Sequence, residues 1–355
     1  MEPDDTATRP HEAGREGRDP DDGVADDTRS RPLRWWLCLL IGAAAATIGL
    51  LPWLVGGMRL PLQNLWATDA LPDEYPLVLL PFNQYFLSQI ASLLIVGAAL
   101  AGIAARATRA RRRRSGVAWI LIGLLAVQVA SIVQTTVVVR DGLQDRFESD
   151  LYLAALVAVA VIANLIGIAV MLLVAAAPRA GAVIGLAVAA VLSSSWLGGL
   201  LLPDPALGGP APEPVLFVLR WLPAVLVGAA IAWGGVGTAG RVIGALVALA
   251  VLWVGPAIIT AVTNAAGSRV LARRPEEMMA YASGVFESAS TRPELVLPPL
   301  VVAIVVALIG LTGRVVVQRR RAPSPAPEPV AAPGGGSAGA SEAVDEPRPP
   351  SSTGD

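Results

Sequence analysis

Two acidic residues stand side by side where a reaction at a membrane surface could use them. Asp73 and Glu74 lie between Pro72 and Pro76, within the segment 58–81 that separates the first two long apolar stretches. A deprotonated carboxylate near an acceptor hydroxyl can act as a general base. Acidic residues beside prolines are also ordinary turn chemistry, so the sequence favours a solvated turn and leaves catalysis as the alternative.

The position of this pair resembles that of an acidic residue in polytopic glycosyltransferases that use lipid-linked sugars. Those enzymes place an acidic catalytic residue in their first outer loop, and Asp73 and Glu74 stand in the corresponding loop here. The resemblance implies a membrane-bound transferase that acts on a lipid-linked substrate, with Asp73 or Glu74 as its base.

Polar side chains recur at helical spacing in the apolar stretch 117–139. At about 3.6 residues per turn they share one face, which is expected to point into a helix bundle because amides facing lipid are costly. That face could line a polar pathway in a passive facilitator or channel. It could also hold helices together by hydrogen bonds, which the sequence favours. With one partner in the stretch 151–175, the intramembrane polar residues are Gln128, Ser131, Gln134, Thr135 and Asn164.

The segment 106–114 holds six arginines and no acidic residue. A soluble partner or a nucleic acid could bind such a loop. Topology alone explains its place, because basic residues collect on the cytoplasmic side of a membrane and contact anionic lipid headgroups there. The sequence therefore predicts anionic headgroups, and no nucleic acid, as partners of Arg106, Arg109, Arg111, Arg112, Arg113 and Arg114.

Several chemistries need residues that the sequence does not supply. All 27 basic residues are arginine, so no lysine is present to form a Schiff base or complete a P-loop. The single histidine, His11, and the single cysteine, Cys38, cannot make a zinc cluster. No apolar stretch carries an ionisable residue near the middle of the membrane, which argues against proton- or cation-coupled transport as the function. The sequence predicts no cofactor and no metal, and it favours a non-enzymatic protein.

The elements that must position these residues follow from composition. Of the 355 residues, 54% are hydrophobic and 15% are charged, and the mean hydropathy is +0.60. Soluble domains carry about 25% charged residues, so a lipid bilayer is the expected solvent. A helix needs about 20 apolar residues to cross it. Eight stretches meet that length: 35–57, 86–105, 117–139, 151–175, 181–202, 215–237, 241–262 and 295–317.

The sequence therefore predicts an all-α polytopic bundle of about eight transmembrane helices. Arginines precede the first stretch and follow the second and the eighth, so the positive-inside rule places both termini in the cytoplasm. The predicted domains are a disordered acidic tail 1–32, a transmembrane domain 33–318 and a disordered Pro/Ala/Gly-rich tail 319–355. The predicted location is the plasma membrane of a bacterium.

The last outer loop contains a helix signal of its own. Pro275 followed by Glu276 and Glu277 is a good helix start. The apolar residues behind it predict a short amphipathic helix on the outer surface, which could gate a cavity or receive a partner. Its apolar face is predicted to hold Met278, Met279, Tyr281, Ala282, Val285 and Phe286.

These observations favour one functional class over two others. The favoured class is a non-enzymatic accessory or permease-like component of a membrane complex, whose partner subunit supplies energy or specificity. The alternatives are a passive facilitator that uses the polar face of 117–139 and a transferase that uses Asp73 or Glu74.

Overall fold

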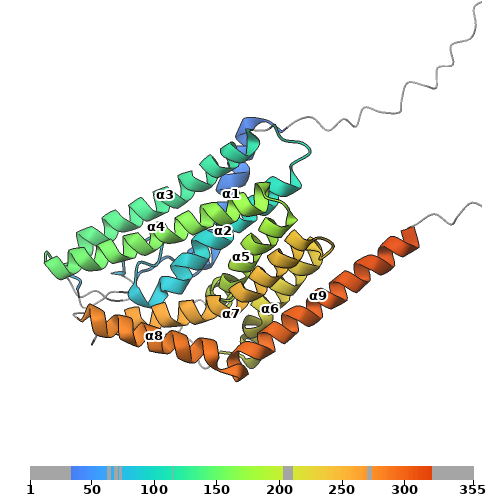
Figure 1. Cartoon of the computed structure of the whole chain (residues 1–355). Helices are drawn as coiled ribbons and strands as arrows, with labels where there is room; N and C mark the ends of the chain where they lie inside the picture. Colours follow the sequence, from blue (N-terminus) through green and yellow to red (C-terminus); the bar gives the residue numbers. More distant parts are fainter. Residues whose placement is uncertain are drawn as a thin grey trace, which may run out of the picture. The chain divides into compact units, whose positions relative to one another are not determined.

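The computed structural model describes residues 33–61, 65–67, 71, 74–113, 115–202, 211–268, 270 and 274–321, except for the side chains of 318–321. Within these residues, eight helices are long and apolar enough to cross a bilayer, which confirms the predicted all-α polytopic bundle (Figure 1). The predicted tail 1–32, and the predicted tail 319–355 beyond residue 321, lie outside the described residues.

The spanning helices are α1 (Trp35–Val55), α2 (Leu87–Ala107), α3 (Gly116–Gly142), α4 (Phe147–Ala176), α5 (Arg179–Leu201), α6 (Glu213–Gly234), α7 (Ala239–Gly267) and α9 (Pro293–Arg321). One turn of 3-10 helix, η2 (Gln84–Phe86), leads into α2. The predicted amphipathic helix is also present as α8 (Pro275–Thr291), which begins at the predicted proline. Helix α9 passes from one compact unit of the chain, which ends at Arg314, into a second that begins at Val315.

Helices α3, α4 and α7 extend, at one end of the bundle, three to five residues beyond the apolar stretches that predict them. Helices α3, α4 and α7 have 27, 30 and 29 residues, whereas α1 and α6 have 21 and 22. The extra turns lie mainly at the end of the bundle that carries residues 56–86 and α8, called here the loop end. The opposite end, which carries residues 108–115, is called the arginine end. In α7 the added polar residues Thr263 and Asn264 donate hydrogen bonds to carbonyls of their own helix, so the helix continues past its apolar part.

Glycines allow the backbones of α1, α2 and α3 to touch. A Cβ atom on Gly42 of α1 would collide with the carbonyl oxygen of Ile120 on α3, and Gly123 of α3 makes the reciprocal close contact with α1. Further along α1, a Cβ atom on Gly49 would lie 2.6 Å from the Cα atom of Gly97 on α2. Small residues let membrane helices approach this closely, and dispersion contacts then hold them.

Helices α5, α6, α7 and α9 share a separate apolar cluster made largely of small side chains. It contains Val183, Ala187, Ala190, Val191, Ala224, Val227, Ile231, Ala245, Ala248, Leu252, Ala303 and Ala307. Gly228 of α6 lies against α9, where a Cβ atom would come within 2.5 Å of the carbonyl oxygen of Ala303. This contact fixes α9 beside α6.

The segment between α1 and α2 folds into the loop end of the bundle. Its two arms pair through backbone hydrogen bonds from Val78 to Met58 and from Leu60 to Pro76, at 3.0 and 3.1 Å. Leu60, Val78 and Phe82 are buried in a cluster with side chains of α2, α3 and α4. Irregular backbone buried in this way needs partners for its polar groups.

Candidate functional site

Two polar side chains of α3 supply those partners. The Gln134 Oε1 atom accepts a hydrogen bond from the backbone N–H of Leu79, and its Nε2 atom donates to the carbonyl of Leu77, each at 3.0 Å. The buried Thr135 hydroxyl oxygen accepts from the backbone N–H of Leu80 at 3.0 Å. Gln134 and Thr135 therefore bind the segment between α1 and α2.

The deeper polar residues of α3 connect three helices. Gln128, only 1% exposed, donates from Nε2 to the carbonyl of Leu94 on α2 at 2.8 Å. Its Oε1 atom accepts from Nδ2 of Asn164 on α4 at 3.1 Å. Ser131 is buried on the same face, and its hydroxyl donates to the carbonyl of Val127 within α3 at 2.8 Å. The amides thus link α2, α3 and α4, while the serine bonds only its own helix.

The acidic pair is described in part. Asp73 lies outside the described residues. Glu74 is exposed, and its Oε2 atom accepts a hydrogen bond from the backbone N–H of Leu71 at 3.3 Å. The backbone N–H of Glu74 donates to the carbonyl of Leu71 at 2.8 Å. These two bonds place the Glu74 carboxylate in a local turn, where side-chain to backbone bonds are common.

Arg106, at the end of α2, folds back onto the end of another helix. Its guanidinium donates to the carbonyls of Val174 and Ala177, at the end of α4, over distances of 2.8 to 3.2 Å. It also lies over the ring of Trp233 on α6, 5.2 Å from the ring centre. The last carbonyls of a helix lack intrahelical partners and carry about half a negative charge, which a guanidinium neutralises well.

The remaining arginines of the segment 106–114 differ in exposure. Arg112 is half-buried and donates from Nε to the carbonyl of Ala105, near the end of α2, at 2.9 Å. Burial, and to a lesser extent the charge of Arg109, lowers the pKa of Arg112. Arg109, Arg111 and Arg113 are exposed, while Arg114 lies outside the described residues. The contact of these arginines with lipid headgroups stays a prediction.

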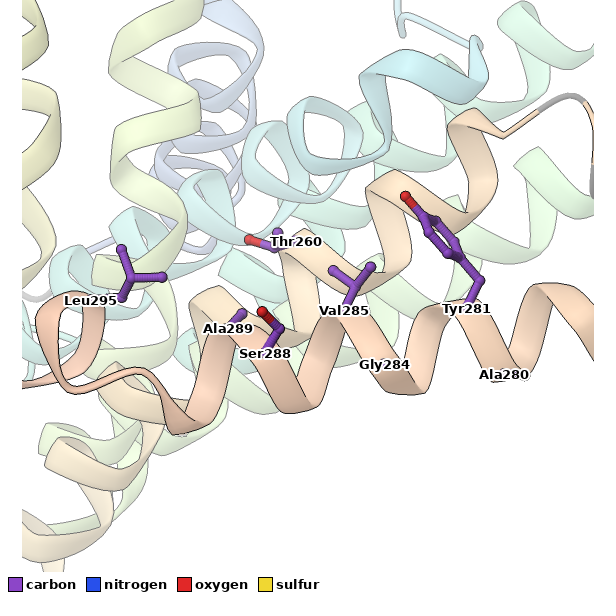
Figure 2. A pocket seen from close by; sticks show the side chains of 8 residues that line it. All are labelled: Thr260, Ala280, Tyr281, Gly284, Val285, Ser288, Ala289 and Leu295. Atoms are coloured by element: carbon purple, nitrogen blue, oxygen red, sulfur yellow. The ribbon is translucent and has the colours of Figure 1, made fainter.

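A groove of about 510 Å³ lies between α7 and α8 at the loop end. Figure 2 shows Val285 and Ser288 on the side of α8 that faces Thr260 of α7. The groove exists because small residues line part of α8, and a Cβ atom on Gly284 would meet nothing within 4 Å. Its lining residues are Thr260, Ala280, Tyr281, Gly284, Val285, Ser288, Ala289 and Leu295. The sequence analysis finds the helix but not the groove, since spacing reveals a face and not the gaps beneath it.

Helix α8 is attached to α7 by polar and apolar contacts. The indole N–H of Trp253 on α7 donates to the carbonyl of Ser290, near the end of α8, at 2.8 Å. Val285 and Phe286 are half-buried as predicted, whereas Met279 and Tyr281 are 70% and 43% exposed. Part of the predicted apolar face thus remains uncovered within the described chain.

The fold and these contacts define a multi-pass membrane protein built from helices. Among the residues that the structure describes, no group of three or more His, Cys, Asp or Glu side chains could hold a metal ion. The one cysteine, Cys38, is buried in the core beside α2 and α3. No protein-family model, curated protein or solved structure matches the chain.

Proposed function

We propose that this chain is a non-enzymatic component of a membrane complex, and that a partner protein binds in the groove between α7 and α8. The observation that carries the proposal is that groove, an open apolar site of about 510 Å³ at the loop end. Its volume is within the range of specific binding sites in proteins, about 300–1,000 Å³.

The surroundings of the groove favour a protein as the occupant. Met279 and Tyr281 present exposed apolar surface beside it, and the exposed charged residues Glu276, Glu277 and Glu287 lie along the same helix. An apolar centre with a polar rim is the usual anatomy of a protein interface. Glu277 forms an ion pair with Arg274 at 3.1 Å, so the negative charge that would repel anionic lipid headgroups comes from Glu276 and Glu287.

The two alternative functions receive less support from the contacts. The polar side chains of α3 that could line a pathway, Gln128, Gln134 and Thr135, hydrogen-bond to α2, α4 and the segment between α1 and α2. The Glu74 carboxylate that could serve as a base is engaged in a turn. We accordingly favour an accessory role in the plasma membrane of a bacterium, with the arginine end in the cytoplasm.

The test compares two glycine substitutions in cells that make the protein. Gly284→Leu fills the groove without a clash at Cβ, and Gly313→Leu on α9 is a matched control because its Cβ also meets nothing within 4 Å. The protein is purified in mild detergent, and the mass and composition of the complex are measured by light scattering and quantitative mass spectrometry. We expect one stoichiometric partner with the wild type and Gly313→Leu, and loss of that partner with Gly284→Leu.

The proposal would be contradicted if the wild-type protein were a monomer without a partner in mild detergent. It would also be contradicted if the Gly284→Leu variant kept the partner at full occupancy. A light-activated crosslinking residue at Tyr281 supplies a second readout, since it should attach to the same partner.

A further inference from the structure

Arginines from several helices surround the last turn of α6 at the arginine end. The Arg106 guanidinium, from α2, lies over the ring of Trp233, 5.2 Å from the ring centre. Arg314, from α9, donates from Nη1 to the carbonyls of Ala232 and Trp233, each at 2.7 Å. Two positive charges therefore stand at the end of α6, where the helix supplies about half a negative charge.

A third arginine joins them at the turn between α6 and α7. A Cβ atom on Gly235 would lie 3.8 Å from Nη1 of Arg241, in the first turn of α7, and 3.9 Å from Nη1 of Arg314. Both guanidinium groups therefore approach one point beside this turn. Arginine pairs placed in this way can donate to one phosphate group through several charge-assisted hydrogen bonds.

A fourth arginine, Arg179, lies at the start of α5 next to this turn. Gly244 of α7 packs against Ala180 of α5. A Cβ atom on this glycine would lie 2.9 Å from the Cα atom of Ala180. This crossing brings the first turns of α5 and α7 together. The charge of Arg179 also repels that of Arg106. We call Arg106, Arg179, Arg241 and Arg314 the arginine cluster.

The positive charge of the arginine cluster is only partly neutralised by the protein. Arg106 and Arg314 bind carbonyls at helix ends, but no side-chain hydrogen bond or ion pair joins Arg179 or Arg241 to another described residue. Every acidic residue that the structure describes lies at the loop end. They are Glu74, Asp141, Asp145, Glu148, Asp150, Glu213, Glu276, Glu277, Glu287 and Glu294. Within the described residues, no carboxylate therefore balances Arg179 and Arg241, and an anion bound beside them would be stabilised.

Helices α7 and α9 expose apolar side chains on faces other than those that carry Arg241 and Arg314. On α7, Ile243 and Leu246 lie about 200° and 140° around the helix from Arg241, and they are 59% and 60% exposed. On α9, Ile309 lies about 140° from Arg314 and is 66% exposed. The arginine cluster stands at the ends of spanning helices, where a bilayer places lipid phosphates, and the acyl chains of those lipids lie against such exposed apolar side chains.

We propose that the arginine cluster binds the phosphate of an anionic phospholipid whose acyl chains lie along the exposed apolar residues of α7 and α9. The site differs from the exposed residues of the segment 106–114, which contact headgroups without a defined geometry. It is independent of the partner groove, which lies at the opposite end of the molecule.

The experiment measures lipid binding to the full-length protein in detergent by native mass spectrometry. The probe is dioleoyl phosphatidylglycerol, with dioleoyl phosphatidylcholine as the zwitterionic comparison and inorganic phosphate as the soluble competitor. The test variant is Arg179→Gln with Arg241→Gln, because neither side chain holds another described residue. Arg34→Gln, at the same end but exposed and outside both the cluster and the segment 106–114, is the matched control.

We expect each cluster arginine that is removed to weaken phosphatidylglycerol binding about fivefold, which corresponds to about 1 kcal/mol per basic residue. The double variant should then bind about thirtyfold more weakly, and Arg34→Gln less than about twofold. Replacement of the same two residues by lysine, which keeps the charge, should restore most of the binding. An unchanged unfolding temperature would show that the variants fold.

Three results would overturn the proposal. The first is unchanged lipid binding by the folded double glutamine variant. The second is an equal loss with Arg34→Gln, which would indicate a general charge effect. The third is displacement of the lipid by millimolar inorganic phosphate, which would assign the site to a soluble anion.

Discussion

Helices α1–α5 and helices α6–α9 differ in the share of their residues that they bury. In the most apolar part of each spanning helix, 39% to 61% of the residues are buried in α1–α5, against 33% in α6, 28% in α7 and 11% in α9. The first region combines glycine contacts with hydrogen bonds between helices, such as Gln128 to Leu94 and Asn164 to Gln128. The second relies mainly on small apolar residues and on Arg314.

This difference shows how membrane helices become tightly packed. Lipid is as apolar as leucine, so apolar side chains alone give no strong drive for helices to associate. Close backbone contact and internal hydrogen bonds supply that drive in the first region. The second region leaves more of its surface for lipid or for other molecules, and it contributes the partner groove as well as Arg241 and Arg314 of the arginine cluster.

The largest expected difference between the regions comes from one substitution made in each. Gly42→Ala puts a methyl group into the carbonyl of Ile120 and should lower the free energy of unfolding by about 3 kcal/mol. Gly313→Ala on α9 meets open space and should raise it by about 0.5 kcal/mol, because alanine restricts the unfolded chain and suits a helix. Unfolding in mixed micelles with increasing denaturing detergent measures both. Equal losses in the free energy of unfolding of the two variants would contradict the difference between the two regions.

An intermediate effect is expected where the two regions meet. Arg106→Gln removes charged hydrogen bonds to the end of α4 and the contact with Trp233 of α6, and should cost about 2 kcal/mol. Arg113→Gln should change stability by less than about 0.5 kcal/mol, because that side chain is exposed. The same micelle titration checks this pair. A similar loss of stability in both variants would mean that Arg106 acts only to orient the chain in the membrane.

The smallest effect concerns the amides inside the first region. Gln128→Leu leaves Asn164 Nδ2 without its bond and should lower stability by about 1 kcal/mol. Adding Asn164→Leu should recover much of that loss, because no buried amide is then unpaired. Thr263→Val on α7 is the control from the second region, since its hydroxyl bonds only its own helix. A stable Gln128→Leu variant would count against interhelical bonding as the role of this face.

The sequence predicts the spanning helices well because the bilayer imposes their length and polarity. Helix α8 is predicted for a similar reason, since Pro275 and the acids after it favour a helix start. The spacing of the polar residues also predicts that Gln128 and Asn164 face the interior of the helix bundle.

The partners of Gln134 and Thr135 were beyond prediction. Gln134 and Thr135 bind backbone groups of residues 77–80, and backbone groups carry no residue signature. The apolar run between Pro76 and Pro81 is the one signal that could have revealed a buried loop. Arg106 shows a second limit, because a basic residue that sets topology looks identical in sequence to one that caps a helix. Asp73 stays a prediction, outside the described residues.

The bonds from α3 to residues 79 and 80 have a consequence for synthesis on the ribosome. Each joins residues that are 55 positions apart, so the earlier partner leaves the ribosome well before the later one is made. Until the third span enters the membrane, the amide groups of Leu79 and Leu80 have only water to bond. The first two spans therefore cannot mature as a separate hairpin, and the segment between them reaches its final structure only once the third span has been made.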